Sequence, residues 1–165
     1  MLNCSIIGLG YIGLPTATVM ANNGIEVRGV DINHNLVNSI NAAITNIKEK
    51  GIEENLKKAI NSGNFQAFNT PQVSDVYIFA VPTPTKKLNG YLPSADTSIL
   101  ENAFLSYLPF FKKNDLVIIE STSPVGTTEE LASIFLKQSD FTKEDIHFVY
   151  CPERVIPGNM LEELE

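Results

Sequence analysis

The sequence predicts an α/β fold, a doubly wound parallel sheet of about six strands with helices on both faces. Three observations favour this fold. Short apolar runs alternate with helix-like stretches from one end of the chain to the other. The apolar runs are mostly continuous, which is typical of strands that are buried on both faces. The length of 165 residues suits one domain that buries roughly 70% of its unfolded surface.

The first half of the chain begins with a strand–helix pair. Residues 2–8 form an apolar run closed by glycine, and residues 13–23 carry apolar side chains on one helical face. Across residues 33–47, apolar side chains recur every three or four positions, which predicts an amphipathic helix. The remaining elements expected in this half are a strand at 25–30, a helix at 53–62 and a short strand at 65–68.

The second half repeats the alternation. A helix with a face of Leu100, Phe104 and Tyr107 is expected to stop at Pro109, and the next helix opens with a capping-box spacing at Thr127. The irregular stretch 82–93, rich in proline, directly follows a buried strand, where a ligand-facing loop belongs. The strands expected here are 76–81, 116–120 and 146–150.

Composition excludes several classes of protein. No apolar run approaches the roughly 20 residues of a membrane span, and the N-terminus lacks the basic region of a signal peptide. The net charge of -7 disfavours nucleic acid and anionic lipid as partners. Two cysteines are too few for a disulfide scaffold and suit a reduced cytoplasm. His34 and His147 show no metal-ligand spacing with other residues, so we expect no metal site.

The junction of the first strand and helix carries the sequence Gly8-Leu9-Gly10-Tyr11-Ile12-Gly13. In a dinucleotide-binding turn of this kind, Gly8 permits the tight turn, Gly10 lets a pyrophosphate approach the backbone, and Gly13 lets helix and strand pack closely. The start of the helix offers free N–H groups to the phosphates. This position of the glycines indicates a Rossmann-type fold.

An acid completes the pattern, because Asp31 ends the second strand 18 residues after Gly13. A carboxylate there accepts hydrogen bonds from an adenosine ribose and repels the 2′-phosphate of NADP. No Lys or Arg follows in residues 32–35, so we expect NAD as the cofactor. Two alternatives are that these residues are only turn and cap residues, and that the glycines serve FAD.

Four further stretches carry a resemblance to a known family. They are Gly10-Tyr11-Ile12-Gly13-Leu14-Pro15, Val81-Pro82-Thr83-Pro84, Glu120-Ser121-Thr122-Ser123-Pro124-Val125-Gly126-Thr127-Thr128 and Cys151-Pro152-Glu153-Arg154-Val155-Ile156-Pro157-Gly158. In this order and spacing, they resemble the N-terminal part of the UDP-glucose/GDP-mannose 6-dehydrogenase family over nearly the whole chain. Arg154 after the glutamate resembles the branch that oxidises UDP-N-acetyl-D-mannosamine, with UDP-glucose or another UDP-HexNAc as the alternative substrate.

The resemblance implies a two-step, NAD-dependent oxidation of a sugar C6 alcohol to a carboxylate, for surface polysaccharide synthesis. Members of the family supply a nucleophilic cysteine and a lysine from beyond the position that corresponds to Glu165. Residues 1–165 are therefore expected to be the NAD-binding domain of a longer enzyme that is a homodimer or larger homo-oligomer. The alternative from another class is a nucleotide-binding module without chemistry.

Residue roles in cofactor binding also follow from the resemblance. Tyr11 and Ile12 match positions that pack against NAD, with a place in the helix core as the alternative. Thr83 matches an NAD contact, with a simple turn residue as the alternative. Ser121 and Thr122 end a strand at the sheet edge where ligands bind, and Thr122 matches a residue beside the nicotinamide. Helix capping is the alternative for this hydroxyl pair.

The last motif is implied to meet the substrate. Glu153 matches the general acid/base of the hydrolysis step, a role suited to a partly desolvated carboxylate, whereas a surface glutamate is the alternative. Arg154 and Val155 match positions that meet the UDP-sugar. Cys151 is expected to pack as a small buried residue rather than act as the nucleophile, and Cys4 is expected to be structural too. Lys86 and Lys87 are candidates for a phosphate contact, but lysines on a loop are more often only solvated.

Overall fold

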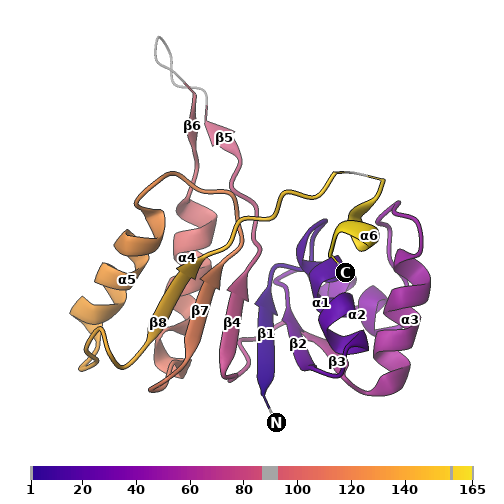
Figure 1. Ribbon diagram of the computed structural model, residues 1–165, viewed down its shortest axis with the longest axis horizontal. Coiled ribbons are helices and arrows are strands. Elements are labelled where there is room, and N and C mark those ends of the chain that lie inside the picture. The colour runs from indigo at the N-terminus through magenta and orange to yellow at the C-terminus, as the bar shows by residue number, and fades with distance from the viewer. Residues whose placement is uncertain (1, 87–92, 157, 165) are drawn as a thin grey trace.

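The computed structural model describes residues 2–86, 93–156 and 158–164. At its centre is a six-stranded sheet in the order β3-β2-β1-β4-β7-β8 (Figure 1), in which every neighbouring pair runs parallel. The strands run outward from β1 in both directions, which is the strand order of the Rossmann fold. The six strands are β1 (Asn3–Ile7), β2 (Glu26–Val30), β3 (Phe65–Phe68), β4 (Val76–Phe79), β7 (Leu116–Ile119) and β8 (His147–Tyr150).

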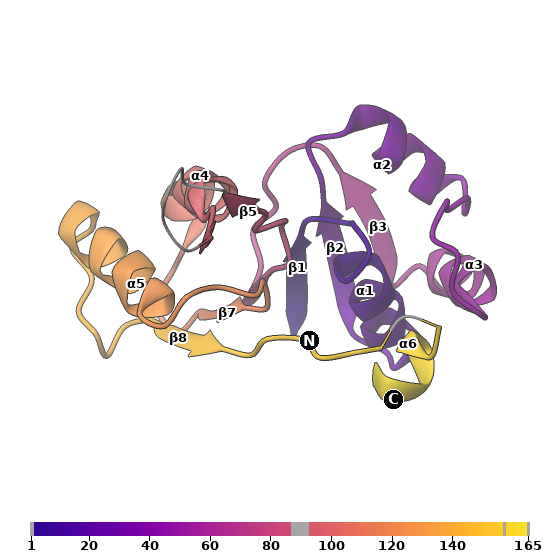
Figure 2. The same cartoon turned by 90° about the horizontal axis from the view of Figure 1, so that it is seen from above.

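Helices cover the two faces of the sheet, and each face has its own apolar core. Seen from above, α1, α2 and α3 lie at one end of the sheet and α4 and α5 at the other (Figure 2). Side chains of α1, α2 and α3 form one core, and those of α4 and α5 form the other, where aromatic rings such as Phe79 and Phe104 pack together. The predicted fold class is confirmed. The helices are α1 (Gly13–Asn22), α2 (His34–Asn41), α3 (Ile52–Ser62), α4 (Ser98–Tyr107), α5 (Thr127–Gln138) and α6 (Met160–Leu164), with a 3-10 turn, η1, at Leu108–Phe110.

The turn between β1 and α1 is closely packed. Gly8 has a φ of +93°, in the left-handed region that favours glycine, and its N–H donates to the carbonyl of Val30 at 2.8 Å. A Cβ on Gly13 would lie 1.9 Å from the carbonyl oxygen of Gly8 and 3.2 Å from the Cβ of Ala80. The tight turn at Gly8 and the close helix–strand packing at Gly13 are therefore as predicted.

The second helix is shorter than predicted, because α2 ends at Asn41 rather than at residue 47. The chain turns at Ala43, which has a φ of +58°, and the N–H of Ile44 donates back to the carbonyl of Ser39 at 2.9 Å. These backbone bonds end the helix without a glycine. Ile47 still packs against the first core, but it does so from a loop.

The capping box predicted at Thr127 is wrong. Gly126 is the N-cap residue of α5, with a φ of +96°, and no side chain caps the helix. Thr127 is the first residue of the helix, and its side chain is buried. Because Thr127 lies inside the first turn rather than before it, its hydroxyl does not cap the helix.

Three short elements were not predicted. β5 (Thr85–Lys86) and β6 (Ser94–Ala95) form an antiparallel hairpin that rises above the sheet (Figure 1). Lys86 lies in this hairpin and pairs with Asp96 at 2.7 Å, whereas Lys87 falls outside the described residues. The third element is α6, a single helical turn that contacts α1.

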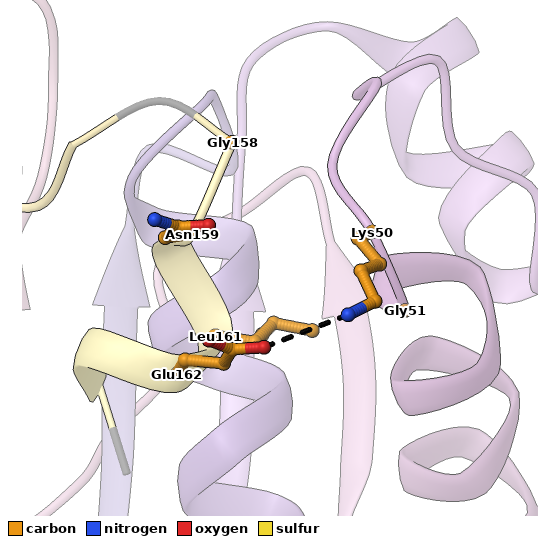
Figure 3. A pocket seen from close by; sticks show the side chains of 6 residues that line it. All are labelled: Lys50, Gly51, Gly158, Asn159, Leu161 and Glu162. Carbon is orange, nitrogen blue, oxygen red and sulfur yellow. Dashed lines mark ion pairs between the residues drawn. The ribbon is translucent and has the colours of Figure 1, made fainter.

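Close to α6, the loop that leads into α3 holds the last segment of the chain. The carboxylate of Glu49 accepts the N–H of Gly158 at 2.9 Å and the hydroxyl of Tyr11. A hollow of about 120 Å³ lies beside this contact, and Lys50 reaches Glu162 across it at 3.6 Å (Figure 3). Because both partners are exposed, this ion pair contributes less than about 1 kcal/mol.

We predict that Gly13→Ala destabilises the fold by about 3 kcal/mol or more, because its Cβ would enter the backbone of Gly8. Gly10→Ala is the matched control, since a Cβ there meets nothing within 4 Å. Urea unfolding of both variants measures the difference. Equal stability of the two variants would show that α1 does not depend on this contact.

Candidate functional site

A pocket of about 330 Å³ lies at the carboxyl edge of the sheet. The residues that line it come directly after β1, β4, β7 and β8, so segments that are distant in sequence meet at one place. Ligands bind at this edge in open α/β sheets. The lining residues are Gly10, Tyr11, Ile12, Ala80, Val81, Pro82, Thr83, Glu120, Ser121, Thr122 and Glu153.

The structure therefore gathers seven of the residues singled out from the sequence in one pocket. They are Gly10, Tyr11, Ile12, Thr83, Ser121, Thr122 and Glu153. Gly8 and Gly13 lie behind the pocket wall in the turn, and Asp31 lies at the end of β2. Arg154 and Val155 follow Glu153 in the chain but do not line the pocket.

The glycine turn leaves room and hydrogen-bond donors in front of it. A Cβ at Gly10 would meet no atom within 4 Å, so the backbone here can be approached closely. Within the described part of the chain, the N–H groups of Gly10, Tyr11 and Ile12 have no acceptor. Tyr11 is 41% exposed and Ile12 is half-buried, so neither is a core residue of α1. The turn has the space and the donors that a diphosphate needs.

The carboxylate of Asp31 connects the turn to β2. One oxygen accepts the N–H of Leu9 at 2.9 Å, and the other accepts the N–H of Asn33 at 2.9 Å. The side chain of Asn33 in turn caps α2. A carboxylate has about four acceptor positions, so Asp31 can hold the turn and still accept hydroxyl groups of a ligand.

Two hydroxyl side chains bring together the loops that follow β4 and β7. Ser121 is buried, and its hydroxyl lies 2.8 Å from the carbonyl of Val81 and 3.1 Å from that of Phe79. The hydroxyl of Thr83 donates to the carbonyl of Thr122 at 2.5 Å. The hydroxyl of Thr122 is exposed and lines the pocket. Ser121 and Thr83 therefore fix the wall that presents Thr122.

Sequence reasoning assigned no role to Glu120, which is only 8% exposed. One of its oxygens, Oε1, accepts the hydroxyl of Thr16 at 3.1 Å, and Oε2 is buried without a partner. Burial raises the pKa of Glu120 to about 7, while the bond from Thr16 lowers it and the nearby charge of Glu153 raises it. A carboxyl group that titrates near neutral pH beside a pocket is typical of a functional site.

The last motif lies on the segment that leaves β8. Glu153 is half-buried, and one of its carboxylate oxygens accepts the N–H of Arg154 at 2.6 Å. The side chain of Arg154 is exposed. The prediction that Cys151 is buried is wrong: it is exposed, because it follows an edge strand and the side chains of α4 and α5 pack on one face of that strand's half of the sheet. Cys4 is buried as predicted, and burial raises its pKa to about 12.

The described residues form neither a cluster of metal ligands nor a helix that could span a membrane. In residues 2–86, 93–156 and 158–164, no three or more His, Cys, Asp or Glu side chains come together as a metal site would require. Across the same ranges, none of the helices has both the length and the apolar character for crossing a membrane.

Comparison with known proteins agrees with the geometry. Residues 2–165 match the profile of the UDP-glucose/GDP-mannose dehydrogenase family, NAD binding domain. The chain belongs to this family. The resemblance noted in the sequence is thereby confirmed, and the cofactor of this NAD-binding domain is NAD, as the glycine turn and Asp31 predict.

Relatives of the NAD-binding domain are longer proteins. The chain is 43% identical to UDP-N-acetyl-D-mannosamine dehydrogenase of Yersinia pestis, over 97% of this chain and 39% of that protein. It is 42% identical to NDP-N-acetyl-D-galactosaminuronic acid dehydrogenase of Ralstonia solanacearum, with the same coverage. The solved UDP-N-acetyl-mannosamine dehydrogenase of Staphylococcus aureus superposes with a TM-score of 0.90 at 39% identity, over 98% of this chain and 39% of that one. The chain thus spans about two fifths of these relatives.

We predict that Glu120→Gln stabilises the NAD-binding domain at pH 8 by up to about 3 kcal/mol and has little effect at pH 4. The pKa of Glu120 in the folded chain, about 7, exceeds the ordinary glutamate value of 4.5 that applies to the unfolded chain. Between pH 4.5 and pH 7, the folded state therefore keeps a proton that the unfolded state has lost. The stability associated with this proton is complete below pH 4.5 and is lost as pH rises through 7. Glutamine stays neutral at both pH values, so the variant does not lose this stability at pH 8.

Urea unfolding of the variant and the parent chain at both pH values measures this effect. Glu129→Gln, on the exposed surface of α5, is the matched control and should change the stability little at either pH. If Glu120→Gln changed the free energy of unfolding equally at pH 4 and pH 8, the raised pKa of Glu120 would be contradicted.

Proposed function

We propose that this chain binds NAD across the carboxyl edge of its sheet, as the NAD-binding domain of a UDP-sugar 6-dehydrogenase. The observation that most supports this function is the open space at Gly10 beside three N–H groups without acceptors in the described chain. Each neighbouring feature fits one part of the dinucleotide. The diphosphate rests on the N–H groups of Gly10, Tyr11 and Ile12, where the positive end of the α1 dipole also favours it.

The two nucleosides of NAD lie on opposite sides of the turn. The carboxylate of Asp31 accepts the hydroxyl groups of the adenosine ribose and would repel the 2′-phosphate of NADP. The nicotinamide half extends over β4 and β7 into the pocket, against Thr83, Ser121 and Thr122. The side chains of Tyr11 and Ile12 pack against the cofactor from the opposite wall. Bound NAD supplies the hydride acceptor for oxidation of the sugar.

The residues after β8 face the substrate in this proposal. Glu153 lines the pocket and is the general acid/base of the hydrolysis step, and Thr122 positions water or substrate beside the nicotinamide. Arg154 and Val155 are the next two residues of the chain, and in this proposal they meet the UDP-sugar. A guanidinium that is exposed and unpaired among the described residues suits a diphosphate, which it can bind bidentately.

The complete enzyme requires residues outside this chain. A nucleophilic cysteine and a catalytic lysine are expected from the remainder of a longer protein, in the cytoplasm, as a homodimer or larger homo-oligomer. Its proposed substrate is UDP-N-acetyl-D-mannosamine, which becomes a uronate for surface polysaccharide. The names of both similar enzymes, from Y. pestis and R. solanacearum, refer to N-acetylated sugars, which supports this class over UDP-glucose.

We expect Gly10→Val to weaken NAD binding tenfold or more without loss of folding. The added side chain would occupy the space in front of the turn, and a tenfold loss corresponds to about 1.4 kcal/mol. Calorimetric titration with NAD measures the dissociation constant, and Gly10→Ala should give an intermediate loss. Unchanged affinity in a folded Gly10→Val chain would contradict the proposed position of the diphosphate.

For the substrate, we expect the longer protein that carries this domain to reduce NAD with UDP-N-acetyl-D-mannosamine at a kcat/KM at least tenfold higher than with UDP-glucose. Reduction is followed by absorbance of the reduced nicotinamide. A preference for UDP-glucose would overturn the proposed substrate and leave the NAD site intact. No reduction with either sugar, while NAD still binds, would favour a binding module.

A further inference from the structure

Glu120 is a buried acid in the pocket that the proposed reaction does not use. It directly follows β7 and lines the pocket, and its carboxyl group contacts Thr16 of α1. Thr16 satisfies its Oε1, whereas its Oε2 has no partner and is shielded from water. Leaving a buried carboxylate oxygen without a hydrogen bond is costly. A positive charge beside this side chain would therefore be favourable, and the described residues that line the pocket do not supply one.

The charges of the residues that line the pocket also favour a ligand with a positive charge. Two of its lining residues are acids, Glu120 and Glu153, and none of its described lining residues is a lysine or arginine. The two carboxyl groups are close enough for the charge of Glu153 to disfavour ionisation of Glu120. A ligand that brings a positive charge into this pocket would relieve that repulsion.

NAD carries one such charge, on the nicotinamide ring of its oxidised form. With the adenosine half over β2 at Asp31 and the diphosphate at Gly10, the ring reaches the part of the site that follows β4 and β7. Reduction adds a hydride to the ring and makes it neutral. The same pocket therefore receives a cation or a neutral ring, depending on the oxidation state of the cofactor.

We propose that Glu120 is the counter-charge of the oxidised nicotinamide ring: its carboxyl group releases its proton when NAD⁺ binds and keeps it when NADH binds. This inference rests on the proposed function, because it takes NAD as the ligand. On binding NAD⁺, the O–H bond of Glu120 breaks, the proton passes to solvent, and the negative charge of the carboxylate offsets the positive charge of the ring. No other bond changes in this step.

Several groups act on the ionisation of Glu120. Burial raises its pKa most, the hydroxyl of Thr16 lowers it, and the negative charge of Glu153 raises it further. The charge of Glu120 also raises the pKa of Cys4, on β1. Because that pKa is about 12, the thiol stays neutral between pH 6 and pH 8. Since the pKa of Glu120 is about 7, its carboxyl group is half protonated at neutral pH. Binding of a cation should then be visible as proton release.

The test is calorimetric titration of the 165-residue chain with NAD⁺ and NADH at pH 6 and pH 8. NAD⁺ should bind about tenfold more weakly at pH 6, because about a tenth of Glu120 is ionised there, and NADH should show no such loss. The adenosine and diphosphate parts are the same in both ligands, so any effect of pH at that end of the site cancels in the comparison. Titration at pH 7 in two buffers with different ionisation enthalpies should give release of about half a proton with NAD⁺ and none with NADH.

Three variants separate this role from a structural one. Glu120→Gln should make NAD⁺ affinity independent of pH between 6 and 8. Glu153→Gln should keep the dependence but move its midpoint to lower pH, and Thr16→Val should move it to higher pH. If Glu153 and Thr16 only supported the fold, their replacement would not be expected to shift the midpoint of the pH dependence in opposite directions.

The outcomes distinguish this inference from the proposed function. Equal pH dependence for NAD⁺ and NADH, or a dependence that persists in Glu120→Gln, would overturn the inference while NAD binding stands. Should Glu120→Gln fail to fold, the proton count of the parent chain decides, and no proton release with NAD⁺ overturns the inference. Failure of the folded parent chain to bind either form would overturn both.

Discussion

The first helix can reach the sheet only because Gly13 has no side chain. A single methyl group there would overlap the carbonyl of Gly8 and press against Ala80, so α1 would have to move away from β1 and β4. That contact places residues 10–12 against residues 80–83, which form two walls of the pocket. The bonds of Asp31 then fix the turn from the β2 side. The position of the site thus follows from one close backbone approach.

The distribution of charge over the site suits a ligand with separated charges. A chain with a net charge of -7 is a poor general binder of anions, and no lysine or arginine is among the described residues that line its pocket. The main-chain N–H groups of the glycine turn offer local positive potential without a cation. On the other side of the turn, two carboxyl groups give the pocket a negative potential. A dinucleotide with an anionic diphosphate and a cationic ring matches both parts.

Local pattern was enough to predict the sheet and the glycine turn, because these depend on short motifs at strand ends. Thr83, Ser121, Thr122 and Glu153, which the structure gathers in the same pocket, were singled out through the family resemblance, and their roles stay predictions. The end of α2 could not be predicted, since Ile44 and Ile47 continue the apolar spacing while backbone bonds at Ala43 stop the helix. The exposure of Cys151 depends on which face of an edge strand the helices cover, which no local pattern records. Glu120 was missed because its burial and its nearness to Glu153 arise only when four strand ends come together.

The central claim is that the main chain of the glycine turn binds the diphosphate. An NMR titration of the ¹⁵N-labelled chain with NAD⁺ tests it most directly, because each N–H group reports separately. We expect the amide signals of Gly10, Tyr11 and Ile12 to shift most strongly as NAD⁺ is added, while amides on the exposed side of α3 stay in place. Saturation with NAD⁺ that leaves the turn signals unchanged, in a chain that is folded, would contradict it.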